Sequence, residues 1–169
     1  KEASSGNGIH LWNCREIEVS GNSIRGHRDG IYLEFARQTE ISKNYSTKNL
    51  RYGLHFMFSD SCRYYSNQFE FNSAGVAVMY SHYVEMKNNK FNNNWGPASY
   101  GLLLKDITDS KITANEFIEN TSGIYIEGCN RSEFEKNLFE KNGWAVKLMA
   151  NSSDNLFTMN NFLSNTFDV

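Results

Sequence analysis

Three side chains in the first half of the chain could bind a soft metal ion together. His55 and Met57 are two residues apart, and Met79 follows Met57 after 22 residues. Two residues apart in a strand share one face, and a repeat of about 22 residues would place Met79 beside Met57. Thioether and imidazole groups are ligands that suit Cu(I). The sequence therefore predicts a labile Cu(I) site at His55, Met57 and Met79.

A second interpretation of the same residues involves no metal. The side chains then form an apolar outer patch that packs against a partner or against the segment around Trp95.

Paired carboxylates would indicate a third possibility, a carbohydrate-binding or polysaccharide-cleaving module. Glu34 and Glu127 share a position in the repeat but lie four repeats apart, about 19 Å, whereas glycosidase pairs are about 5–9.5 Å apart. Lys105 falls beside Glu127 and predicts a salt bridge.

The elements that must position these residues form a repeat. Each copy opens with Gly, or with Ala in the last copy, and apolar residues follow one and three positions later. An Asn stands fourteen positions after the opening residue in the regular copies, and a second Asn or a His stands five positions beyond it. The copies open at Gly8, Gly30, Gly53, Gly75, Gly101, Gly123 and Ala145.

This period predicts an all-β fold, a right-handed single-stranded parallel β-helix of about seven coils with three short strands per coil. The alternation of apolar residues predicts a strand with one face inward. We expect the aligned Asn residues to adopt the left-handed conformation at corners and to hydrogen-bond along the axis, with Phe stacks filling the interior. Residues 1–169 are predicted to form one domain, and its first seven residues are expected to be a polar leader.

The fourth copy is longer than the others, and its extra residues fall in NWGPASY (94–100). An insertion in a solenoid becomes a loop that bulges from one corner, often on the working face. We therefore take Trp95, Pro97 and Tyr100 as candidate partner-binding residues. Trp12, expected to be exposed, is added because its ring could stack on a ligand or partner.

Composition excludes some classes of function. The net charge is −2 and the pI about 6.1, which gives no reason to expect nucleic-acid binding, and no apolar run is long enough to span a membrane. Cys14 and Cys129 lie five coils apart, about 24 Å, too far for a disulfide, and Cys62 has no partner in an adjacent coil. The chain starts without Met or a signal peptide, so we expect a piece of a longer protein.

Several long stretches are similar to one known family. They are NLRYGLHFMFS (49–59), AGVAVMYS (74–81), NWGPASYGLLLKDI (94–107) and NGWAVKLMANSSDN (142–155), together with DGIYLEFA (29–36) and NTFDV (165–169). These stretches resemble the NosD family of β-helix proteins from the nitrous oxide reductase maturation system. The resemblance covers essentially the whole chain and implies the same fold as the repeat.

The resemblance also implies a function. It implies a periplasmic, non-catalytic component of an ABC transporter system made with NosF and NosY, in contact with the membrane only through the transporter subunit. Such a protein takes copper from the lipoprotein NosL and helps load it into apo-nitrous oxide reductase. The matching stretches include His55, Met57, Met79 and the Trp95 loop, but the resemblance does not assign ligands one by one. Copper could also be held on coils outside this sequence or at the NosL interface.

Overall fold

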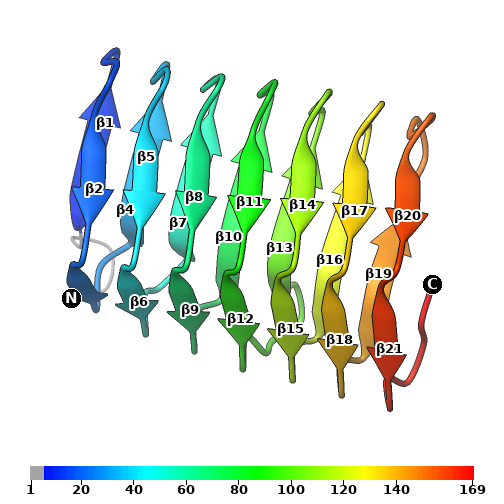
Figure 1. Ribbon diagram of the computed structural model, residues 1–169. Coiled ribbons are helices and arrows are strands. Elements are labelled where there is room, and N and C mark those ends of the chain that lie inside the picture. Colours follow the sequence, from blue (N-terminus) through cyan, green and yellow to red (C-terminus); the bar gives the residue numbers. More distant parts are fainter. Residues whose placement is uncertain (1–5) are drawn as a thin grey trace.

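The chain forms a right-handed parallel β-helix of seven coils (Figure 1), as the repeat predicts. The structure is a computed structural model that describes residues 6–169, so most of the expected leader lies outside the described residues. Each coil contributes one strand to each of three seven-stranded parallel sheets. The described residues contain no helix long and apolar enough to cross a membrane.

The three sheets run the length of the stack. The first sheet contains β1 (Ile9–Trp12), β4 (Asp29–Glu34), β7 (Tyr52–Met57), β10 (Ala74–Met79), β13 (Tyr100–Lys105), β16 (Ser122–Glu127) and β19 (Trp144–Leu148). The second contains β2 (Glu18–Ser20), β5 (Glu40–Ser42), β8 (Arg63–Tyr65), β11 (Glu85–Lys87), β14 (Lys111–Thr113), β17 (Glu133–Glu135) and β20 (Leu156–Thr158). The third contains β3 (Ser23–Arg25), β6 (Tyr45–Thr47), β9 (Gln68–Glu70), β12 (Lys90–Asn92), β15 (Glu116–Ile118), β18 (Leu138–Glu140) and β21 (Asn161–Leu163).

Glycine opens each of the first six coils because neighbouring coils approach each other closely at that position. A Cβ on Gly53 would lie 2.7 Å from the carbonyl oxygen of Gly75 and 2.9 Å from the ring of Phe69. Real Cβ atoms do not approach backbone oxygen so closely, so a larger residue would push the coils apart. The repeated glycine therefore keeps the inter-coil hydrogen bonds in place.

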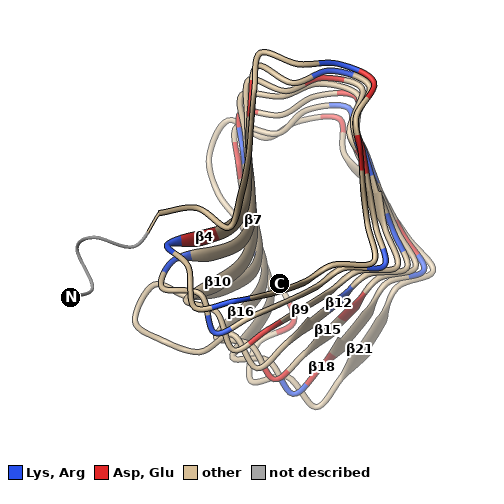
Figure 2. Ribbon diagram, turned by 90° about the vertical axis from the view of Figure 1, so that its left-hand side faces the viewer, with Lys and Arg blue, Asp and Glu red and all other residues tan. Residues whose placement is uncertain are grey.

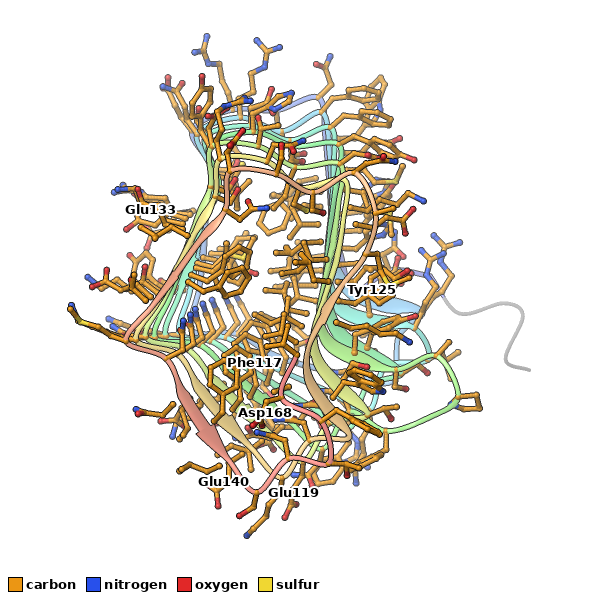
Figure 3. The ribbon with its side chains drawn as sticks, turned by 90° about the vertical axis from the view of Figure 1, so that its right-hand side faces the viewer. Phe117, Glu119, Tyr125, Glu133, Glu140 and Asp168 are labelled. Atoms are coloured by element: carbon orange, nitrogen blue, oxygen red, sulfur yellow. The ribbon has the colours of Figure 1, made fainter. Side chains whose placement is uncertain are left out.

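Stacked aromatic rings fill the interior beside the third sheet. Figure 3 shows Phe117 pointing into the coil, whereas Tyr125 and Glu133 point away from it. Successive ring centroids in this stack are 4.6 to 5.6 Å apart. The stack consists of Phe69, Phe91, Phe117, Phe139 and Phe162. Ser46 replaces the aromatic residue in the second coil and donates a hydrogen bond to the Gly53 carbonyl at 2.8 Å.

The two Asn ladders form as predicted, but their backbone conformation was predicted wrongly. Asn44 donates from both its backbone N–H and its side-chain amide to Oδ1 of Asn67, each at 3.0 Å. Its amide also donates to the Val19 carbonyl in the coil before. The positive φ belongs to the residue ahead of the ladder, such as Lys43 (φ 54°) and Ser66 (φ 55°). The corner residue turns its side chain outward, which leaves Asn free to satisfy inward-facing backbone groups.

Candidate metal and partner-binding site

The outer face of the first sheet carries the predicted copper residues. Tyr32, His55 and Ala77 are register partners across β4, β7 and β10, and two residues further along Glu34, Met57 and Met79 form the adjacent row. The local sequence puts these side chains outside because Leu54 and Phe56, the alternate residues of β7, are fully buried in the core. The period of two therefore decides which residues leave the interior.

Met57 and Met79 lie side by side on this face. They are register partners in neighbouring parallel strands, which are about 4.8 Å apart, and both side chains are half-buried. The Tyr32 hydroxyl lies 3.7 Å from the Met57 sulfur, within the range of a weak hydrogen bond to sulfur. Two thioethers at this spacing are suitable ligands for a single soft ion.

His55 differs from the prediction, because it points outward but is covered. Its side chain is only 6% exposed. The ring stacks on Tyr32 at 4.9 Å between centroids and lies against Tyr52 at 4.8 Å. Neither ring nitrogen has a hydrogen-bond partner among the described residues, and Nδ1 lies 3.5 Å from Oδ2 of Asp29. A buried imidazole with unpaired nitrogens is an uncommon arrangement that a ligand could complete.

A partly buried ion pair lies directly beside His55. Arg51 donates from Nε to Oδ1 of Asp29 at 2.8 Å and from Nη2 to Oδ2 at 2.5 Å, a bidentate geometry. The Asp29 side chain is fully buried and that of Arg51 is half-exposed. Burial alone would raise the pKa of Asp29, but the hydrogen bonds and charge of Arg51, with a smaller contribution from His55, lower this pKa to about 2. Asp29 is therefore an anion held against a cation.

This ion pair is the part of the site that sequence reasoning missed. Neither Asp29 nor Arg51 is among the candidate residues that the sequence pattern indicates. The available signal was the repeat itself, because Asp29 and Tyr52 each precede the opening glycine of their coil and are register partners. Arg51 is the residue before Tyr52, which places it next to Asp29.

The residues suited to other metals do not converge. Among residues 6–169, no three His, Cys, Asp or Glu side chains come together as a metal-binding group. All three cysteines are free, and burial raises the pKa of the Cys62 and Cys129 thiols to about 11. Those two thiols are protonated near neutral pH, so a candidate site for a soft ion depends on Met57 and Met79, with His55 as a third ligand only if its ring turns.

The predicted partner-binding residues occupy two places. Trp12 ends β1 and is 64% exposed, in the same row as Met57. Trp95 and Pro97 are exposed on the inserted loop, which projects from the stack as the green loop on the right of Figure 3. Thr121 anchors this loop through two 3.1 Å hydrogen bonds, one from Gly96 N–H and one to the Gly96 carbonyl.

Tyr100 lies where the loop rejoins β13. Its side chain is half-buried, and its ring lies against Tyr125 with centroids 5.0 Å apart. It therefore contributes to the first sheet as well as to the loop. Further along the same face, Lys105 and Glu127 form the predicted salt bridge at 3.4 Å. Glu34 and Glu127 are separated by β7, β10 and β13, so these carboxylates do not form a pair.

Comparisons with solved structures show that the fold occurs in polysaccharide-modifying enzymes. The periplasmic alginate epimerase AlgG, as a T265N T268M double mutant, superposes with a TM-score of 0.74 at 17% identity, covering 85% of this chain and 34% of that one. The A-module of the Azotobacter vinelandii mannuronan C-5 epimerase AlgE4 gives 0.59 at 12% identity, covering 90% and 61%. Bacteriophage CBA120 tailspike protein 2 gives 0.66 at 15% identity, covering 95% and 32%.

These likenesses are too distant to indicate more than the β-helix fold, and this chain spans about a third of the epimerase AlgG. No curated protein matches the sequence. The match that carries information on function is to a protein family, and it extends over residues 1–169. The chain belongs to the NosD family, described as periplasmic copper-binding proteins.

Proposed function

We propose that this chain is a non-catalytic, periplasmic copper-handling scaffold. It receives Cu(I) from a donor such as the lipoprotein NosL and passes it toward apo-nitrous oxide reductase, within a transporter system that includes NosF and NosY. The family description supports the link to copper and to the periplasm. The observation that carries the proposal is the register of Met57 and Met79, which places two partly accessible thioethers side by side.

Copper is cargo in this proposal. A site that binds copper weakly and leaves coordination positions open can pass the ion on more easily than a site that encloses it. Two thioethers bind Cu(I) through soft sulfur and leave other coordination positions open to a donor or an acceptor. His55 adds a third ligand if its ring leaves the stack between Tyr32 and Tyr52, because its nitrogens have no competing hydrogen bonds. Trp12 and the loop at Trp95 and Pro97 supply the exposed aromatic and rigid groups that a docking partner would contact.

The test is an anaerobic Cu(I) titration against a colorimetric chelator. Leu replaces Met with little change in volume, so Met57→Leu with Met79→Leu should leave the fold unchanged in circular dichroism. We expect the wild type to compete for about one equivalent of Cu(I) and this variant to lose that competition. Met149→Leu with Met159→Leu is the matched control, because it removes two thioethers from the last coil.

His55→Gln examines the third ligand in the same assay. A loss of Cu(I) affinity smaller than that of the methionine variant is expected, because His55 is the least accessible of the three residues. If the wild type does not compete for Cu(I), or if the control variant loses as much affinity as Met57→Leu with Met79→Leu, then this face holds no copper site. The protein would then act as a docking scaffold, with copper held elsewhere.

A further inference from the structure

A second site lies at the corner that follows the first sheet, on the side away from the Trp95 loop. A cavity of about 400 Å³ opens there along the first three coils. Its volume falls in the range of small-molecule sites. It is lined by Asn13, Cys14, Arg15, Phe35, Arg37 and Phe58. Neither the copper proposal nor the family description accounts for it.

One wall of the cavity is the end of an exposed aromatic stack. Phe35 stacks on Phe58 at 5.3 Å between centroids with a 10° angle between planes, and Phe58 stacks on Tyr80 at 5.0 Å with 13°. The next residue of this row, in the first coil, is Asn13, which carries no ring. One face of Phe35 is therefore left uncovered at the cavity, and Phe35 is 48% exposed.

Two arginines also line the cavity. Arg15 and Arg37 are bridge partners in adjacent coils, so two like charges stand one above the other. Arg15 donates to the Gln38 side chain at 2.9 Å, and its Nε lies 3.6 Å from a Glu16 carboxylate oxygen. The Arg37 guanidinium, in contrast, has no hydrogen bond or ion pair within residues 6–169. Asp60, the next residue in the row, accepts the backbone N–H of His82 in the following coil. Like charges directly opposite repel each other, and an anion between them would remove the repulsion.

We propose that this cavity binds a uronate residue of an acidic oligosaccharide. The face of an aromatic ring carries partial negative charge, and the C–H groups of a sugar ring present partial positive charge to it. A uronate placed on the open face of Phe35 directs its carboxylate toward Arg37 and Arg15, which match carboxylate geometry through paired N–H donors. Asn13 adds a side-chain amide that can hydrogen-bond sugar hydroxyls.

The cavity favours a sugar over an acidic peptide. An acidic side chain would neutralise the arginines but would leave the aromatic face without a partner. A uronate supplies the ring and the carboxylate in one residue. Successive coils are about 4.8 Å apart, so the stack of Phe35, Phe58 and Tyr80 offers ring edges along the path of a longer chain. The site is separate from Met57 and Met79 and does not depend on copper.

The test is isothermal titration calorimetry of the whole chain with trigalacturonate, and with its methyl ester as the neutral counterpart. We expect binding of the acid and none of the ester. Arg37→Gln should weaken binding about tenfold, the scale of one charged hydrogen-bonding partner. Phe35→Leu should weaken it similarly while keeping an apolar side chain at the same left-handed corner, and Phe35→Tyr should retain binding.

Arg25→Gln is the matched control, because Arg25 is an exposed arginine of the first coil on the third sheet. It should bind the trimer like the wild type, as should Met57→Leu with Met79→Leu. The proposal is overturned if the trimer gives no heat at millimolar concentration, if the methyl ester binds equally, or if Arg25→Gln weakens binding as much as Arg37→Gln. Tighter binding of an acidic peptide than of the trimer would also overturn it, in favour of a protein partner.

Discussion

The interior and the outer face of the first sheet use the same seven strands but follow different rules. Inside, successive coils repeat one type of residue, because each side chain packs between equivalent side chains above and below it. Outside, the residue type changes from coil to coil. One outer row consists of His10, Tyr32, His55, Ala77, Leu103, Tyr125 and Lys147. The comparison teaches that the repeat specifies the scaffold, whereas departures from charged solvent-facing residues mark candidate binding surfaces.

The second sheet shows what an ordinary outer face looks like. Figure 2 shows acidic and basic residues side by side along its wall, including Arg63 with Glu40 and Lys111 with Glu133. Around β4, β7 and β10 the first sheet instead presents Met57, Met79 and covered aromatic residues. Partly exposed apolar groups that are clustered in this way are typical of interaction sites.

The largest effect should come from breaking an interior ladder. Asn89→Ala removes the acceptor of two hydrogen bonds from Asn67 and the donor to the Tyr64 carbonyl. Buried polar groups left unpaired each cost about 1–3 kcal/mol, so we expect a loss of about 3–5 kcal/mol in the free energy of unfolding. Urea denaturation measures it. The exposed Asn161→Ala should change stability by no more than about 0.5 kcal/mol; equal losses in both variants would contradict the distinction between interior and outer face.

An intermediate effect should come from the ion pair under the candidate copper site. The pKa of Asp29 is lowered in the folded state from 3.8 to about 2, so its stabilising effect is present above pH 4 and is lost as the pH falls toward 2. This lowering of the pKa corresponds to at most about 2.5 kcal/mol of folding free energy. The actual contribution is smaller, because Arg51 is half-exposed and solvent screens the pair. Unfolding free energies of the wild type and Asp29→Asn between pH 6 and pH 2 should therefore converge at the acid end. Parallel curves would show that Asp29 contributes no such pH dependence.

The smallest effect should come from the ordinary outer face. Lys111 and Glu133 lie 3.5 Å apart and both are exposed. Exposed pairs contribute about 0–1 kcal/mol because solvent screens them. Lys111→Ala should change the free energy of unfolding by less than about 1 kcal/mol at low salt, and by less still in 0.5 M salt. A loss as large as that of Asn89→Ala would mean that the outer faces also determine the stability of the scaffold.

Much of the scaffold could be predicted because each coil repeats the same local sequence pattern. The opening glycines, the Asn ladders, the exposed Trp12 and the Lys105–Glu127 pair follow from positions in the repeat. The left-handed corners were assigned to the wrong residue, since Asn is the usual occupant of that conformation but here Asn44 and its equivalents are needed to bond inward-facing backbone groups. The stack of Phe35, Phe58 and Tyr80 was overlooked although its residues recur five positions after each opening glycine.

The sequence alone determined the β-helix, its coil boundaries and which side chains face outward, because alternation and period are properties of neighbouring residues. Only the tertiary structure decided how accessible those side chains are. His55 faces outward yet is buried, because Tyr32 and Tyr52 cover it and Asp29 with Arg51 closes the space beside it. Likewise, the cavity at Phe35 exists because Asn13 is too short to continue the aromatic stack. Accessibility depends on side-chain sizes within a coil and also in the adjacent coils, whose residues, such as Tyr32 beside His55 and Asn13 beside Phe35, are 22 or more positions away in the sequence.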